Sequence, residues 1–176
     1  MHRSFYIDMD GVLMKYDKEA YTGENPIWLQ KNAHYFRDLP PDRKALEFID
    51  RLWEKCRYTG DEVFILTTLP MNSAMFNEHF HDKMLSLNKW VSYIDIEHIL
   101  ISVTAKNEAV EYIRDHKLTQ NDVLIDDYNK NLASWQNAGG TAVKYCNGIN
   151  DPNSWNGPKI TADDPVYLMF HKLGIQ

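Results

Sequence analysis

The feature that most constrains the fold is a pair of carboxylates placed directly after a short run of strand-forming residues. Residues 5–7 are Phe, Tyr and Ile, all typical of a β-strand, and Asp8, Asp10 and Gly11 come next. In open α/β sheets, ligands bind at the carboxyl ends of the strands, and a glycine there lets the chain turn. We therefore expect Asp8 and Asp10 to lie at the ligand-binding edge of a sheet.

The length and charge of the chain limit what kind of protein it is. Its 176 residues fit a single domain, and its 25 acidic and 19 basic residues give a net charge of −6, which disfavours binding to a long nucleic acid. The two cysteines, Cys56 and Cys146, lack the spacing of a metal or redox motif. With no signal peptide and no apolar stretch long enough to span a membrane, we expect a soluble cytoplasmic protein.

Apolar runs alternate along the chain with segments of helical periodicity. This alternation predicts a three-layer α/β fold with a mostly parallel five-stranded sheet and right-handed crossovers. Besides the first strand, strands are expected at residues 63–66, 98–103, 121–125 and 141–145. Helices are expected from Asp42 to about Arg57, from Ser73 to Trp90, over residues 105–113 and 129–137, and from a cap at Thr161 to near Gly174.

Residues 16–41, between the first strand and the first long helix, form an insertion that we expect to be a small helical cap. The segment contains Gly and Pro residues and lacks clear periodicity. Five aromatic residues fall within residues 16–36, a much higher density than the 12% of the whole chain. Two interpretations are open: the rings roof a pocket over Asp8 and Asp10, or they form only the small core of the insertion.

Polar side chains stand where several predicted strands end. Thr67 and Thr68 follow the second strand, and Asp126 and Asp127 follow the fourth, where adjacent acids repel one another unless a cation lies nearby. Lys106 opens the helix after the third strand, where the helix dipole disfavours a positive charge. Either Lys106 reaches an anion, or it is an ordinary solvated surface lysine.

Parallel strands bring these ends to one edge of the sheet, so we expect a single site there. Oxygen ligands without His or Cys favour Mg²⁺, and Mg²⁺ in turn points to a phosphate substrate. A carboxylate can attack phosphorus when a metal and a lysine neutralise the phosphoryl oxygens, and a second acid can protonate the leaving oxygen. The side chains expected in this site are Asp8, Asp10, Thr67, Lys106, Asp126 and Asp127.

These residues resemble, in order along the chain, the four motifs of the haloacid dehalogenase (HAD) superfamily. The motifs correspond to residues 7–12, to Thr67 at the end of a strand, to Lys106 at the start of a helix, and to residues 124–127. The resemblance covers most of the chain. It implies a single HAD-like domain over residues 1–176, Rossmann-like, with the small cap inserted after the first strand.

The resemblance also implies a role for each side chain. Asp8 would be the nucleophile and Asp10 the general acid and base, while Thr67 and Lys106 would hold the phosphoryl group. Dehalogenases of similar fold lack the second acid and need no metal, so Asp10 favours a phosphatase over a dehalogenase. The implied Mg²⁺ ligands are Asp8, the backbone carbonyl of Asp10, Asp127, and Asp126 either directly or through water.

Within the superfamily, the chain is most similar to the 5'(3')-deoxyribonucleotidases and their bacterial and phage relatives. By analogy with these enzymes, Tyr16 and Trp28 would stack on a nucleobase and Thr68 would contact the substrate. The similarity lies in residues 8–13, 36–41, 64–68, 83–90 and 124–127.

The leading hypothesis is a Mg²⁺-dependent phosphomonoesterase that hydrolyses nucleoside monophosphates, preferring deoxyribonucleotides, through an aspartyl phosphate. The first alternative is the same chemistry on another small metabolite, such as a sugar phosphate. The second is a non-catalytic HAD-fold binding protein, which is disfavoured because no motif residue is replaced. A phosphatase acting on nucleic-acid ends is disfavoured by the net charge.

Residues 147–158 are expected to form a long loop that braces either the site or a partner.

Overall fold

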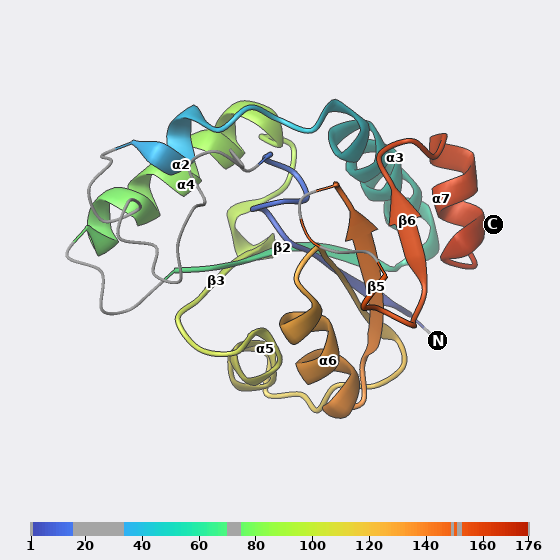
Figure 1. Cartoon of the computed structure of the whole chain (residues 1–176). Coiled ribbons are helices and arrows are strands. Elements are labelled where there is room, and N and C mark those ends of the chain that lie inside the picture. Colours follow the sequence, from blue (N-terminus) through green and yellow to red (C-terminus); the bar gives the residue numbers. More distant parts are fainter. Residues whose placement is uncertain (1, 16–33, 70–74, 149, 151–152, 176) are drawn as a thin grey trace.

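The computed structural model describes residues 2–15, 34–69, 75–148, 150 and 153–175. These residues form six strands, all paired in parallel, in the order β3-β2-β1-β4-β5-β6 (Figure 1). The strands are β1 (Ser4–Ile7), β2 (Glu62–Thr68), β3 (Ile99–Ser102), β4 (Asp122–Asp126), β5 (Thr141–Cys146) and β6 (Lys159–Thr161).

Helices cover both faces of this sheet, which confirms the predicted α/β architecture. Helices α3 and α7 lie on one face and α5 and α6 on the other, while α2 and α4 lie together beside the carboxyl ends of the strands (Figure 1). The helices are α2 (Tyr35–Asp38), α3 (Arg43–Thr59), α4 (Phe76–Trp90), α5 (Lys106–Ile113), α6 (Asn129–Asn137) and α7 (Val166–Lys172), with a 3₁₀ turn, η1, at Ile96–His98.

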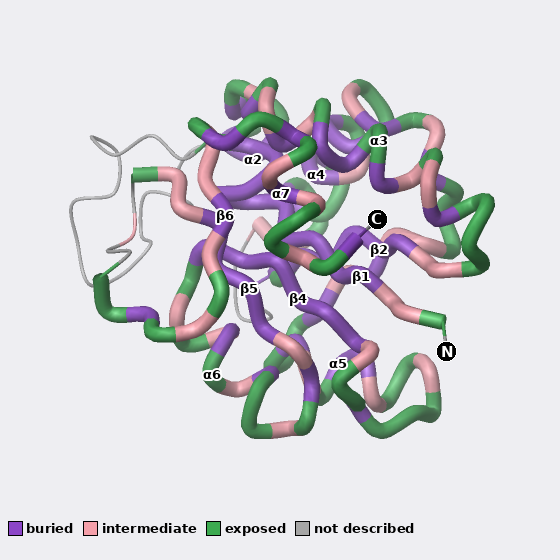
Figure 2. The backbone as a smooth tube through the Cα atoms, turned by 90° about the vertical axis from the view of Figure 1, so that its right-hand side faces the viewer, coloured by how far each residue is buried: buried purple, intermediate pink, exposed green. Residues whose placement is uncertain are grey.

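Alternating side chains of the central strand β1 fill two separate apolar cores. Phe5 and Ile7 pack on the side of α3 and α7, whereas Tyr6 points to the side of α5 and α6. The Tyr6 ring lies 5.2 Å from Phe64 and 5.0 Å from Trp135. Figure 2 shows the inner strands buried along most of their length, as expected for a parallel sheet covered on both faces.

Helix α3 begins where the sequence predicts it and ends slightly later. The Asp42 carboxylate caps its first turn by accepting hydrogen bonds from the backbone N–H groups of Lys44 and Ala45, at 3.0 and 3.1 Å. The helix continues to Thr59 and stops at Gly60, whose φ of +77° suits glycine and whose N–H donates to the Cys56 carbonyl.

The prediction of five strands and of a helix capped by Thr161 is wrong. Thr161 belongs to a sixth strand, β6, which pairs with β5 at the edge of the sheet. The last helix, α7, begins only at Val166, after a turn in which Thr161 N–H donates to Asp164 Oδ2. A strand of three residues is too short to produce a recognisable alternation of apolar and polar side chains, so sequence periodicity does not reveal it.

The expected cap at residues 16–41 lies for the most part outside the described residues. Its last part contains α2, which packs on α4. The rings of Tyr35 and Phe36 are buried, 5.2 Å apart, and Phe36 also meets His79 of α4 edge to face at 5.1 Å. These two aromatic residues therefore serve the packing of α2 on α4.

Among the described residues, no helix has both the length and the apolar character needed to cross a membrane.

Gly140 provides a test of the packing between α6 and the sheet. A Cβ atom at this position would lie 2.2 Å from Nε1 of the buried Trp135, which donates a hydrogen bond to the Asp122 carbonyl. Gly140→Ala should therefore lower the free energy of unfolding by about 1–3 kcal/mol, measured by urea denaturation. Gln136→Ala, at an exposed position of α6, should change it by less than about 0.5 kcal/mol. Equal stability of the two variants would contradict this packing.

Candidate functional site

The site lies where the two halves of the sheet meet. The strand order is that of a doubly wound sheet, whose halves diverge between β1 and β4, and ligands bind at such a point. Ile7 of β1 pairs with Ile125 of β4, so Asp8, just after β1, and Asp126, the last residue of β4, lie next to each other. All six side chains expected in the site are buried, each at most 7% exposed: Asp8, Asp10, Thr67, Lys106, Asp126 and Asp127.

A tight turn after β1 makes room for the acids. The N–H of Gly11 donates to the Met14 carbonyl at 2.7 Å, and the N–H of Met14 donates to the Met9 carbonyl at 2.8 Å. Gly11 has a φ of +85°, and a Cβ atom there would lie 2.2 Å from Asp127 Oδ2. Gly11 is therefore required both by the turn and by the carboxylate that lies against it.

Three of the acids could share one metal ion. Asp8, Asp126 and Asp127 each offer a carboxylate oxygen, and these oxygens lie within 4.8 Å of one another. Burial raises the pKa of Asp8 well above its usual value; the neighbouring acids, Asp126 foremost, raise it further, and Lys106 opposes them. Burial, followed by the charge of Asp126, raises the pKa of Asp127 to about 7. Buried oxygen donors that resist ionisation without a cation fit a hard divalent ion such as Mg²⁺.

Lys106 lies among these acids and is 3% exposed, so the interpretation as a solvated surface lysine is wrong. Its Nζ lies 2.7 Å from Asp8 Oδ1 and 2.7 Å from Asp126 Oδ2. Burial alone would lower the pKa of Lys106, but the carboxylates of Asp126 and Asp8 raise it above its usual value. The ammonium is therefore a permanent positive charge beside the predicted nucleophile.

Asp126 is held rigidly by several donors besides Lys106. Its Oδ1 accepts the backbone N–H of Tyr128 at 2.8 Å, and its Oδ2 accepts the side-chain amide of Asn131 at 3.0 Å. Because both of its oxygens already accept hydrogen bonds, Asp126 orients the start of α6 and the Lys106 side chain in addition to facing the acid cluster.

Asp127 is held by residues that are not among those predicted from the sequence. The side-chain amides of Asn147 and Asn150 both donate to Asp127 Oδ2, at 2.8 and 2.7 Å. The buried ammonium of Lys144 donates to the Asp127 carbonyl at 2.8 Å and to Asn129 Oδ1 at 2.6 Å. Of the two possibilities for the loop after β5, bracing the site is therefore the one that the structure supports.

Asp10 lies in a second polar cluster, together with Thr67 and Lys83. The Thr67 hydroxyl lies 3.1 Å from Asp10 Oδ2, and the ammonium of Lys83 contacts the same oxygen. Lys83 is not among the site residues predicted from the sequence, although a signal was present. Lys83 is four residues from both His79 and Leu87, so it falls on the same face of α4 as these two buried residues, where a charged residue needs a partner.

The predicted substrate contacts are only partly described. Thr68 is the last residue of β2; its side chain is exposed, and its carbonyl accepts a hydrogen bond from Lys83 at 2.9 Å. Tyr16 and Trp28 lie outside the described residues.

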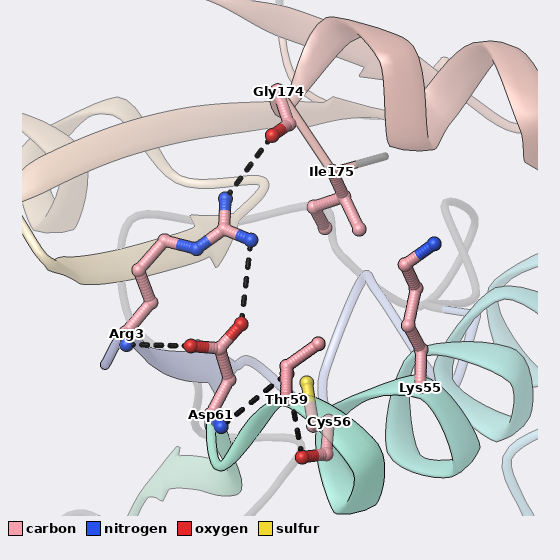
Figure 3. Close-up of a pocket in the computed structure, with 7 residues that line it drawn as sticks. All are labelled: Arg3, Lys55, Cys56, Thr59, Asp61, Gly174 and Ile175. Carbon is pink, nitrogen blue, oxygen red and sulfur yellow. Dashed lines mark hydrogen bonds and ion pairs between the residues drawn. The ribbon is translucent and has the colours of Figure 1, made fainter. Parts of the chain in front are cut away.

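A separate cavity of about 260 Å³ lies at the opposite end of the sheet, beside the amino ends of β1 and β2 (Figure 3). Its Arg3 guanidinium is paired with Asp61 Oδ2 at 3.3 Å and with the Gly174 carbonyl at 3.4 Å. Burial raises the pKa of the Cys56 thiol to about 12, so this thiol stays protonated and is a poor nucleophile. The cavity is part of the packing between the two ends of the chain.

Comparison with known proteins shows that the fold is similar to that of solved HAD hydrolases. No family model and no curated protein sequence matches the chain. Solved structures do match: a hydrolase from Pseudomonas syringae is 14% identical with a TM-score of 0.60, and 99% of each chain is covered. The D,D-heptose 1,7-bisphosphate phosphatase from B. bronchiseptica, solved with magnesium and phosphate, is 14% identical with a TM-score of 0.61, and 98% of each chain is covered. A HAD family hydrolase from Deinococcus radiodurans, solved with phosphate and sodium, is 12% identical with a TM-score of 0.62, over 98% of this chain and 95% of that one.

The raised pKa of Asp127 predicts how stability depends on pH. In EDTA, the folded protein retains a proton on Asp127 up to a pH of about 7, whereas the unfolded chain releases it near the usual value of 3.8. The folded state therefore binds more protons between these two values, and its free energy of unfolding should fall as the pH rises from about 4 to about 7. The fall should be smaller in Asp127→Asn, whose amide does not titrate. Identical slopes in urea titrations of the two proteins would contradict the shift.

Gly11 predicts a link between the first turn and metal binding. In Gly11→Ala the new Cβ collides with Asp127 Oδ2, so Mg²⁺ should bind at least about tenfold more weakly, as measured by calorimetry. Gly174→Ala is the matched control, because Gly174 also has a positive φ, of +62°, but a Cβ atom there would meet no described side chain or backbone atom within 4 Å. Equal Mg²⁺ affinities in the two variants would show that Gly11 serves only the turn.

Proposed function

We propose that the protein is a Mg²⁺-dependent phosphomonoesterase that hydrolyses nucleoside monophosphates, preferring deoxyribonucleotides, through an aspartyl phosphate on Asp8. The observation that carries the proposal is the position of two acids at the end of β1. Asp8 lies against the acid cluster and Lys106, while Asp10 points into a different cluster with Thr67 and Lys83. Two carboxylates in such different surroundings suit the two roles of nucleophile and general acid.

In the first step, Asp8 attacks the phosphorus of the substrate. Its Oδ1 accepts hydrogen bonds from Lys106 and from the Met9 N–H, each at 2.7 Å, so we assign the attack to Oδ2. A bond forms between Oδ2 and phosphorus, and the bond from phosphorus to the ester oxygen breaks. Lys106 supplies positive charge beside the phosphoryl oxygens.

Asp10 moves the protons in both steps. It gives a proton to the ester oxygen as the alcohol leaves, and it then takes a proton from the water that attacks the aspartyl phosphate. Cleavage of that intermediate releases inorganic phosphate and restores the Asp8 carboxylate.

The residues suited to hold Mg²⁺ are Asp8, Asp127, Asp126 and the backbone carbonyl of Asp10. Support comes from the proximity of the three aspartate carboxylates. This cluster, found among the described residues, contains neither His nor Cys, which favours Mg²⁺ over softer metals. When bound, the ion would draw electrons from the phosphoryl group and offset the repulsion between that group and Asp8. Asn147 and Asn150 keep Asp127 pointed into the site.

The choice of a nucleotide substrate rests on the resemblance to deoxyribonucleotidases and on the aromatic insertion. Tyr16 and Trp28 would stack on the base, and Thr68 would contact the substrate from the end of β2. A sugar phosphate is the second candidate, because two structures of similar fold are described as D,D-heptose bisphosphate phosphatases, at 14% and 12% identity. A non-catalytic binding role is less favoured, since the nucleophile, the acid and the metal carboxylates are all present.

The test is phosphate release from deoxyribonucleoside, ribonucleoside and sugar monophosphates, with Mg²⁺ or with EDTA. The wild type should release phosphate only with Mg²⁺ and fastest from deoxyribonucleotides, and Asp8→Asn should lose at least about 10³-fold, because no nucleophile remains. Equal or faster turnover of sugar phosphates would replace the nucleotide assignment by the second candidate. An unchanged activity in Asp8→Asn, or no release from any ester, would contradict the phosphatase mechanism.

A further inference from the structure

Lys83 is a fully buried lysine to which none of the four superfamily motifs assigns a role. Its Nζ contacts Asp10 Oδ2, lies 2.7 Å from Thr67 Oγ1, and lies 2.9 Å from the Thr68 carbonyl. An ammonium group has three N–H bonds, and these three acceptors use all of them. Lys83 therefore has no donor left for a substrate phosphate in this arrangement.

The two oxygens of Asp10 have different surroundings. Oδ2 is held by Lys83 and by the Thr67 hydroxyl at 3.1 Å. Oδ1 is buried and has no hydrogen-bond partner among the described residues. A buried carboxylate oxygen without a partner is costly, and such an atom in a native site is usually completed by a ligand. The hydrogen bonds thus immobilise Oδ2 of Asp10 and leave Oδ1 available to a ligand.

We propose that Lys83 is a positioning residue that, together with Thr67, anchors Asp10 through Oδ2 so that Oδ1 meets the oxygen of the leaving alcohol and of the attacking water. This inference rests on the proposed phosphatase function and adds to it the atom that carries the proton. Lys83 acts through Asp10 and does not bind the phosphoryl group.

The support of Lys83 comes from the helices beside the sheet. Lys83 belongs to α4, and its Nζ lies 4.3 Å from the centre of the Phe36 ring of α2, which shields the ammonium from solvent. The neighbouring Asp82 is 2% exposed and lies 3.1 Å from Nδ1 of His34, just before α2. The packing of α2 on α4 thus fixes the lysine, and through it the orientation of the acid.

The first test is the dependence of turnover on the leaving group in Lys83→Met, which keeps the side-chain stem and removes the ammonium. Turnover of an alkyl phosphate, whose leaving oxygen needs a proton, should fall by about 10²-fold or more, while turnover of p-nitrophenyl phosphate should fall less than about tenfold. KM should stay within about twofold, because the phosphoryl contacts are intact. Lys89→Met, at an exposed position of α4, should match the wild type on both esters.

The second test asks whether Lys83 acts through Asp10. On phenyl phosphate, adding Lys83→Met to Asp10→Asn should change the rate less than about twofold, because the anchored acid is already absent. Multiplicative losses in this double mutant, or equal losses on all three esters in Lys83→Met, would overturn the role of Lys83. Lys83→Leu, which also removes the donor, replaces Lys83→Met if circular dichroism shows that the latter does not fold. No release by the wild type would overturn the proposed function itself, and this inference with it.

Discussion

The main constraint on this structure is the repulsion among carboxylates that the parallel sheet brings close together. Because β1 lies directly beside β4, the acids that follow them cannot avoid one another, and the oxygens of three of them come within 4.8 Å. In a buried setting such crowding is unfavourable unless positive charge is close. Many of the residues around the site reduce this repulsion by supplying positive charge or hydrogen-bond donors.

The lysines and asparagines that do this lie on five different segments of the chain. Lys106 from α5, Lys83 from α4 and Lys144 from β5 are each at most 3% exposed, and they face the site from three directions. Within the described part of the chain, the site therefore contains four buried carboxyl groups and three buried ammonium groups. A divalent cation and a phosphate dianion together add no net charge, so a loaded site keeps the same balance. The amides of Asn131, Asn147 and Asn150 add direction without charge.

The sequence predicts five of the six strands and the proximity of three acids, because both depend on local signals. Apolar runs mark the inner strands, and the rule that parallel strands end at one edge brings Asp8, Asp126 and Asp127 together. Lys83 was missed because its role depends on how α4 docks beside the sheet, and a lysine in a helix is normally solvated. Asn147 and Asn150 were missed because nothing local distinguishes them from other polar loop residues.

The ion pairs of Lys106 mean that the buried acids do not depend on a metal ion alone for positive charge. In small metal-nucleated domains, the ion is the only charge that can draw the ligands together, so binding and folding are a single event. Here the chain carries its own cation, tethered within 2.7 Å of two of the acids. The Mg²⁺ that we propose for this site would therefore meet acids that the chain already holds close together with its own charge. In this proposal, metal binding would add stability to a site that is already folded and would not be the event that forms it.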